Sequence, residues 1–151
     1  MKKIILTGSF DPFTLGHLDI AKRALRTWGN CTVVMLKNDD KNYMFDQDVR
    51  AALTRASLVG TQIDFDTHDG FVADYCKKNN VGLIVRGIRD GKEFDYEKKM
   101  AHANAKLCGV ETVFLPARLK ISSTIVREAI LAKKPLEQLL AQSALNVITR
   151  D

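Results

Sequence analysis

The chain of 151 residues has few of the features that mark membrane, secreted and fibrous proteins. Its apolar runs are far shorter than the roughly 20 residues that cross a bilayer. The apolar stretch behind Met1 is three residues long, too short for the core of a signal peptide. Nine glycines and three prolines exclude collagen-like and low-complexity proteins. We therefore expect one compact domain over residues 1–151, in the cytoplasm and with no membrane partner.

Cysteine is also scarce, and Cys31, Cys76 and Cys108 form no CxxC pair. An odd set of isolated cysteines in apolar sequence is typical of free, buried thiols in a reducing compartment. The three histidines lie far apart, and none stands at ligand spacing from a cysteine, so the sequence shows no legible zinc site.

Several motifs for phosphate binding and covalent catalysis are missing. The sequence has no GxxxxGK[ST], no GxGxxG and no GxSxG, which argues against a P-loop, a dinucleotide fingerprint and a nucleophile elbow. What it does have is positive charge in one half. Residues 1–75 hold nine basic and ten acidic side chains, whereas residues 76–151 hold fourteen and eight. This excess predicts an anionic partner and is only a weak sign of nucleic acid.

Apolar periodicity alternates between strand-like and helix-like segments along the chain. Short apolar runs predict five strands, at Lys3–Thr7, Thr32–Leu36, Ile63–Thr67, Val81–Arg86 and Glu111–Leu115. Helical spacing predicts helices at Gly16–Thr27, Asp46–Val59, Gly70–Asn79, Glu93–Leu107 and Ser123–Lys133, and a last helix opened by Pro135. This order indicates an α/β fold, a doubly wound five-stranded parallel sheet. Ligands of such sheets bind beyond the carboxyl ends of the strands.

The segment after the first strand combines flexible backbone with a histidine at a helix start. Gly8 and Gly16 permit a close backbone approach or a positive φ. With Thr14 as N-cap, His17 falls at the third helical position, where a cation opposes the helix dipole. This arrangement favours an anion at the helix N-terminus. The alternative is a neutral surface or capping histidine.

Cations and hydroxyls also follow the other strands. Arg86-Gly87-Ile88-Arg89 ends the fourth strand, and paired guanidinium groups suit phosphate oxygens. Residues 121–127 begin a helix with three consecutive hydroxyls and an arginine, a good cradle for phosphate. Lys41 lies in the polar loop of residues 38–42. Alone, the hydroxyls are more often a plain helix cap with a solvated arginine and the lysine is more often solvated, while ordinary exposed arginines are an equal alternative for the arginine pair.

Together these residues resemble a known superfamily. Gly8-Ser9-Phe10-Asp11-Pro12, then Thr14-Leu15-Gly16-His17, and later Ile121-Ser122-Ser123-Thr124 are similar to the nucleotidyltransferases with [HT]xGH and ISSTxxR signatures. Within it, the chain resembles the bacterial phosphopantetheine adenylyltransferase family by Thr14 in place of histidine, by the polar loop with Lys41 ahead of Met44-Phe45, and by the segments at residues 84–89 and 94–104. The resemblance runs from residue 4 to about residue 130.

The resemblance implies a Rossmann-like nucleotidyltransferase fold and a reversible reaction. ATP and 4′-phosphopantetheine would give dephospho-coenzyme A and pyrophosphate, by in-line attack without a covalent enzyme intermediate. Magnesium would be carried by the ATP phosphates and water rather than by protein ligands. The family also implies a homohexamer.

The resemblance further implies a role for individual residues. The catalytic residues would be His17, Lys41 and Arg89. The ATP-binding residues would be Ser9, Phe10, His17, Gly87, Ile88, Arg89, Glu97, Arg118, Leu119, Lys120, Ile121, Ser122, Ser123 and Thr124. The residues that bind 4′-phosphopantetheine would be Ser9, Lys41, Val72, Arg86 and Asn104.

Two other functions remain open at this point. Sister enzymes of the superfamily adenylylate other acceptors, such as nicotinamide mononucleotide or glycerol phosphate, and more often carry histidine at the position of Thr14. A non-enzymatic nucleic-acid binder would explain the basic second half, although the sequence has no strip of alternating aromatic and basic residues. Such binding would weaken steeply with salt and would survive the replacement His17→Ala.

Overall fold

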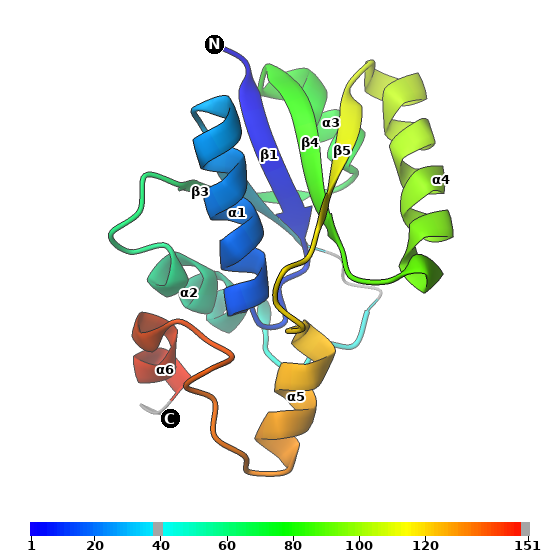
Figure 1. Ribbon diagram of the computed structural model, residues 1–151. Helices are drawn as coiled ribbons and strands as arrows, with labels where there is room; N and C mark the ends of the chain where they lie inside the picture. Colours follow the sequence, from blue (N-terminus) through cyan, green and yellow to red (C-terminus); the bar gives the residue numbers. More distant parts are fainter. Residues whose placement is uncertain (38–40, 149–151) are drawn as a thin grey trace.

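The computed structural model describes residues 1–37 and 41–148, and its centre is a five-stranded parallel sheet (Figure 1). The strand order is β3-β2-β1-β4-β5, and every neighbouring pair is parallel. The strands are β1 (Lys3–Gly8), β2 (Thr32–Lys37), β3 (Asp64–Asp69), β4 (Val81–Ile88) and β5 (Glu111–Pro116). The predicted sheet is therefore confirmed, with β4 reaching two residues further than its apolar run indicated.

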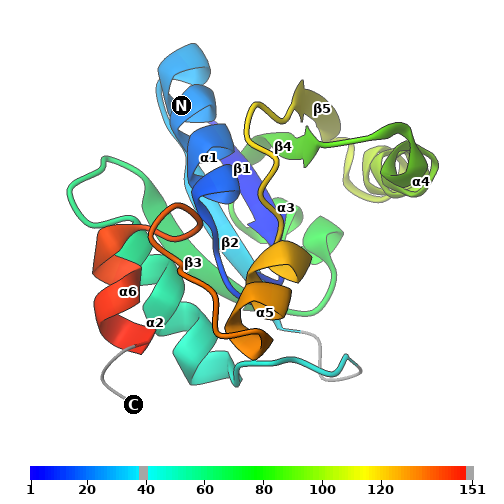
Figure 2. The ribbon, with the colours of Figure 1, turned by 60° about the horizontal axis from the view of Figure 1, so that its bottom comes forward.

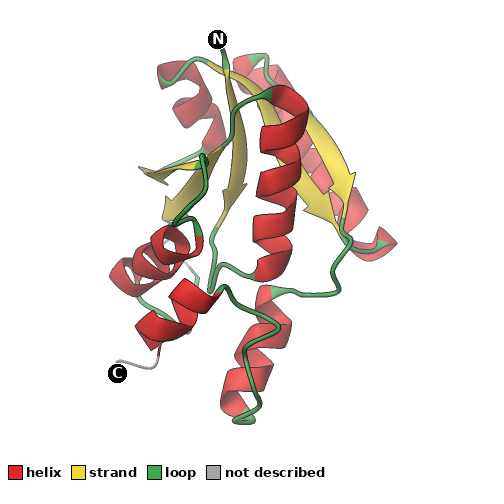
Figure 3. Ribbon diagram, turned by 60° about the vertical axis from the view of Figure 1, so that its left-hand side comes forward, coloured by secondary structure: helices red, strands yellow, loops and turns green. Residues whose placement is uncertain are grey.

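Helices cover both faces of the sheet, as Figure 3 shows. One face carries α1 (Leu15–Trp28) and α2 (Gln47–Ser57), and the other carries α3 (Val72–Lys78) and α4 (Gly91–Cys108). Alternation along β1 explains this, because Ile4 and Leu6 pack with the first pair of helices while Ile5 packs with Tyr75 of α3. The fold is the expected doubly wound α/β arrangement.

Two further helices, α5 (Ser123–Leu131) and α6 (Gln142–Ile148), lie beyond the carboxyl ends of the strands (Figures 1 and 2). They share a third apolar cluster with α2, in which Leu53, Val126, Leu140 and Ala144 are buried. This cluster fixes the start of α5 below the sheet, which is the place where ligands of doubly wound folds bind.

The predicted helix opened by Pro135 is wrong. Residues 137–140 form a turn, and the last helix begins only at Gln142. The turn buries Leu140 to 1% exposure against α2, and its Leu139 carbonyl accepts the N–H of Leu15 at 2.9 Å. Leu139 and Leu140, whose spacing is helical, therefore fix the turn against the start of α1 and against α2.

The structure also bears on the cysteines. Cys31 and Cys76 are buried, Cys108 is half-buried, and all three are free thiols. Burial raises the pKa of Cys31 and of Cys76 to about 12, so both are protonated at neutral pH. Among the described residues, no helix combines the length and the apolar character needed to cross a membrane.

Candidate active site

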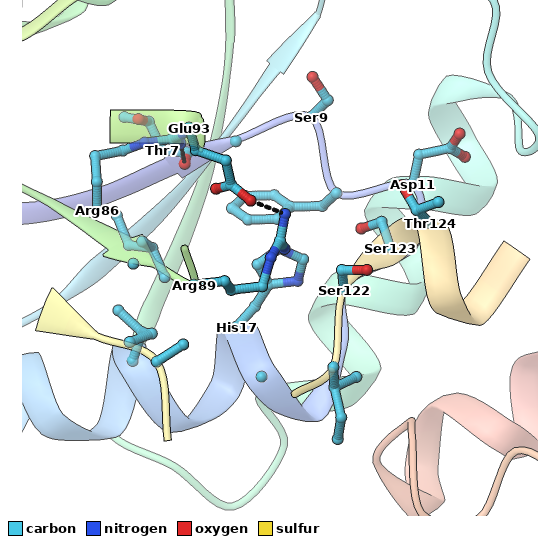
Figure 4. Close-up of a pocket in the computed structure, with 18 of the residues that line it drawn as sticks. Thr7, Ser9, Asp11, His17, Arg86, Arg89, Glu93, Ser122, Ser123 and Thr124 are labelled. Atoms are coloured by element: carbon cyan, nitrogen blue, oxygen red, sulfur yellow. Dashed lines mark hydrogen bonds and ion pairs between the residues drawn. The ribbon is translucent and has the colours of Figure 1, made fainter. Parts of the chain in front are cut away.

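A polar cavity of about 450 Å³ lies at the carboxyl ends of β1 and β4, between the first turns of α1 and α5 (Figure 4). Most of the residues predicted to bind ATP line it: Ser9, Phe10, His17, Gly87, Arg89, Glu97, Leu119, Ile121, Ser122, Ser123 and Thr124. Figure 4 shows His17 in the middle, with Arg86 and Arg89 on one side and the three hydroxyls of α5 on the other. The separate motifs of the sequence therefore meet in one place.

The first turn of α1 is capped as the sequence predicts. The hydroxyl of Thr14 accepts the N–H groups of Gly16 and His17, at 3.1 and 3.3 Å. Gly16 is required by a close approach rather than by its φ. A Cβ added there would lie 2.6 Å from the carbonyl oxygen of Ile121. The absence of a side chain thus brings the start of α1 against the segment that leads into α5.

His17 is held in one tautomer and is not the cation that the sequence indicated. Its Nδ1 accepts the N–H of Thr14 at 3.0 Å, which completes a capping box and leaves the proton on Nε2. Burial, helped by the positive charges of Arg86 and Arg89, lowers the pKa of His17 to about 3. The ring therefore offers a neutral N–H donor to a ligand in the cavity.

Phe10 forms the wall behind His17. Its φ is +51°, a conformation that costs a residue with a side chain about 1–2 kcal/mol. The ring packs edge-on against Phe13 and His17, with centroids 5.1 Å from each. A Cβ added to Gly8 would lie 2.7 Å from this ring. Close packing thus limits the rotation of the imidazole and explains the glycine at position 8.

The first turn of α5 uses its hydroxyls for different contacts. Ser122 is the N-cap and accepts the N–H of Ile125 at 3.1 Å, whereas Ser123 donates to the carbonyl of Pro12 at 2.9 Å. Thr124 accepts from Arg127, which also donates to the carbonyl of Asp11 at 2.9 Å. Arg127 lines the cavity, and it also braces the loop between β1 and α1.

Both arginines of the Arg86-Gly87-Ile88-Arg89 segment are paired with carboxylates of α4. Arg86 donates to both oxygens of Glu97, at 2.7 and 3.0 Å, and to the carbonyl of Thr7. Arg89 donates to Glu93 at 2.6 Å, the dashed contact in Figure 4. These pairs hold the guanidinium planes at the cavity wall, where they lower the cost of bringing in negative charge.

A second cavity of about 690 Å³ adjoins the first, between the start of α3 and the side of α4. All residues predicted to bind 4′-phosphopantetheine line it: Ser9, Lys41, Val72, Arg86 and Asn104. Leu36, Phe71 and Met100 make its lining more apolar than that of the first. Both cavities are bounded by Thr7, Gly8, Ser9, Lys41, Arg86 and Glu97. The arrangement suits two ligands whose charged ends meet at this common wall.

Three residues predicted to bind ATP line neither cavity: Ile88, Arg118 and Lys120. Ile88 ends β4, and its carbonyl accepts the N–H of Ala117 at 2.8 Å. The roles given to these three residues stay predictions. Lys41 belongs to the described residues, whereas residues 38–40 of its predicted loop do not.

Sequence reasoning missed several residues of the site. Arg50 of α2 is 3% exposed and donates to the carbonyl of Ser9 at 2.9 Å. Glu93 pairs with Arg89, and the Asp11 carboxylate binds the backbone of Met44 and Phe45. An arginine on the apolar side of an amphipathic helix was the available signal for Arg50.

Comparison with known proteins gives consistent matches. The model of the cytidylyltransferase-like family matches residues 5–129. Phosphopantetheine adenylyltransferase of Christiangramia forsetii is 36% identical over 132 residues, 85% of this chain and 87% of its own length. The enzyme of the same name from Fusobacterium nucleatum is 40% identical over 134 residues, 85% of this chain and 82% of its own length.

A solved structure matches in fold. It is that of a proposed nicotinate-nucleotide adenylyltransferase from Vibrio parahaemolyticus, with a TM-score of 0.68 and 18% sequence identity. The match covers 98% of this chain and 99% of that one. At this identity the likeness establishes the nucleotidyltransferase fold and does not distinguish between acceptors.

Proposed function

Since the chain belongs to the cytidylyltransferase-like family and, within it, to the phosphopantetheine adenylyltransferases, we propose that it transfers the adenylyl group of ATP to 4′-phosphopantetheine. The products are dephospho-coenzyme A and pyrophosphate, so the reaction belongs to coenzyme A biosynthesis. The observation that carries the proposal is the common wall of the two cavities. A polar cavity for a nucleotide and a more apolar one for a pantetheine arm share Ser9, Lys41 and Arg86.

The reaction needs one displacement. ATP lies in the polar cavity, with its phosphates at the first turns of α1 and α5, where backbone N–H groups and helix dipoles favour anions. Lys41 and Arg86 hold the phosphate of 4′-phosphopantetheine at the common wall, and Val72 and Asn104 contact the arm. An oxygen of that phosphate attacks the α-phosphorus as the bond to pyrophosphate breaks.

His17 stabilises the charge that builds up on the α-phosphate. The hydrogen bond at Nδ1 keeps the proton on Nε2, and the ring lines the polar cavity, so little reorganisation is needed during the reaction. Arg89 supplies a second positive charge on the same side. A neutral imidazole donor of this kind binds the transition state without needing to gain or lose a proton.

Magnesium enters, in this proposal, with ATP. Among the described residues no group of three His, Cys, Asp or Glu side chains could hold a metal ion. The carboxylates that line the polar cavity, those of Asp11, Glu93 and Glu97, already bind N–H groups of the protein. Phosphate oxygens and water suit Mg²⁺ well as ligands.

Two broader expectations accompany this function. Free thiols at all three cysteines fit the reducing cytoplasm. A homohexamer would cover the large apolar side chain of Leu107, which α4 leaves exposed outside both cavities. Light scattering of the purified protein measures the assembly directly.

The test is pyrophosphate release in a panel of acceptors. Purified protein with ATP and magnesium should release pyrophosphate with 4′-phosphopantetheine and much more slowly with nicotinamide mononucleotide or glycerol phosphate. Release with one of the latter alone would assign the protein to a sister activity. His17→Ala should abolish most of the release, whereas nucleic-acid binding that survives this replacement and weakens steeply with salt would favour the binding function.

A further inference from the structure

Asp11 lies in the wall of the polar cavity and is 6% exposed. Its carboxylate accepts two backbone N–H groups of one segment: Oδ2 accepts from Met44 and Oδ1 from Phe45, both at 2.9 Å. Two hydrogen bonds from consecutive amides fix both the position and the orientation of the segment they belong to. The carboxylate therefore ties the lysine loop, residues 41–45, to the loop between β1 and α1.

Asp11 is itself held from α5. Arg127 donates to the Asp11 carbonyl at 2.9 Å, and its guanidinium lies 3.9 Å from Oδ2. Ser123 donates to the carbonyl of the next residue, Pro12. The carboxylate thus stands on a braced backbone, and it can act as an anchor for a neighbouring loop.

A second connection joins the same two loops. The guanidinium of Arg50 lies 3.7 Å from the ring centroid of Tyr43, in the lysine loop, and donates to the carbonyl of Ser9. Arg50 is buried, so this stacking works in a poorly solvated place. The C-terminal end of the lysine loop is therefore held at Tyr43, Met44 and Phe45, a few residues after the exposed Lys41.

We propose that Asp11 is a positioning residue that places Lys41 against the acceptor phosphate, by holding the lysine loop over the common wall of the two cavities. Lys41 is a point charge on a flexible stem, so its location depends on where its backbone is fixed. The inference rests on the proposed function, because the acceptor phosphate is the group that Lys41 binds there.

The test is the replacement Asp11→Asn, which removes the charge and turns an amide N–H₂ toward one of the two backbone N–H groups. Loss of hydrogen bonds to a buried charge predicts that the KM for 4′-phosphopantetheine rises about 10- to 100-fold. The KM for ATP should change by much less. The matched control is Asp46→Asn. It removes the same charge from the residue directly after Phe45, and it keeps a side-chain oxygen that can accept the N–H of Val49. Its KM values should equal those of the wild type.

A double-mutant cycle shows whether Asp11 acts through Lys41. In the Lys41→Ala background, Asp11→Asn should no longer raise the KM for the acceptor. Effects that multiply in the double variant, an equal rise in KM for both substrates, or a raised magnesium requirement would overturn the proposal. Hydrogen exchange at Met44 and Phe45 gives a readout independent of activity, and it should accelerate in Asp11→Asn.

If Asp11→Asn does not fold, Asp11→Ser removes the charge without adding a donor amide. The KM for 4′-phosphopantetheine should then rise in Asp11→Ser, with a much smaller change in the KM for ATP. If wild-type protein releases no pyrophosphate with 4′-phosphopantetheine, the proposed function fails and the role of Lys41 fails with it. An active wild type with an unchanged acceptor KM in Asp11→Asn refutes the positioning role alone.

Discussion

Replacing Gly16 by alanine should push apart the two helix starts that are proposed to bind the phosphates. The added Cβ would lie 2.6 Å from the carbonyl oxygen of Ile121 and 3.3 Å from the hydroxyl of Thr14. Ordinary contact requires about 3.5 Å, so backbone must move by about 1 Å. A misplacement of that size can reduce the rate about 10²-fold. We therefore expect kcat for pyrophosphate release to fall about 100-fold in Gly16→Ala.

The stability of Gly16→Ala gives an independent measure of this close contact. In a helix with open space, alanine in place of glycine gains up to about 1 kcal/mol, whereas overpacking costs about 1–3 kcal/mol. The contact with Ile121 predicts that Gly16→Ala is destabilised and that its Tm falls by a few degrees. Gly91, at the start of α4, is the matched control, because nothing lies within 4 Å of its added Cβ. Gly91→Ala should be as stable as the wild type or more so.

Differential scanning fluorimetry and a coupled pyrophosphate assay on the three proteins measure both effects. A fully active Gly16→Ala protein with a raised Tm would show that the starts of α1 and α5 need not approach closely. That result would contradict the requirement for a close approach of the two helix starts at Gly16.

The remaining predictions concern His17 and Glu97. His17→Ala should lower kcat about 10²- to 10³-fold with the fold intact, and a rate within a few fold of the wild type would contradict its role. Because the pKa of His17 is lowered to about 3 in the folded protein, the unfolded chain binds a proton between pH 3 and 6.5 that the folded chain excludes. Stability therefore falls as the pH falls through this range, by up to about 1.4 kcal/mol per pH unit from this group. In His17→Asn, the free energy of unfolding measured with urea should depend on pH with a slope that is shallower by that amount. Equal slopes would show that His17 titrates normally. Glu97→Gln weakens the bidentate pair with Arg86 and should cost about 1–3 kcal/mol of stability and raise the KM of both substrates, whereas unchanged KM values would show that Arg86 needs no such partner.

The centre of the sheet could be predicted because its inner strands are buried on both faces. Val33, Val34 and Val85 are fully buried, so β2 and β4 read as continuous apolar runs that stand out from the helices between them. The final helix could not be predicted in the same way. Leu136, Leu139 and Leu140 have helical spacing, but only packing against α2 decides whether such a run forms a helix or a turn.

The site shows a similar division. Residues on short motifs at strand ends, such as His17 and Ser122, were found because the topology of a doubly wound sheet dictates where strand ends meet. The protonation of His17 could not be predicted from spacing, because it depends on burial and on two arginines far along the chain. Asp11 and Arg50 were missed for a similar reason, since each has a hydrogen-bond partner far along the chain: Met44 lies 33 residues from Asp11, and Ser9 lies 41 residues from Arg50.

The stereochemical course at the α-phosphorus tests most directly the claim that two ligands meet at a common wall and react with each other. The substrate is ATP with sulfur in place of one non-bridging α-oxygen, of known configuration. A single displacement by the acceptor phosphate predicts inversion of configuration in the dephospho-coenzyme A product. Retention would mean that an enzyme side chain first takes up the adenylyl group, and the direct transfer between the two cavities would be contradicted.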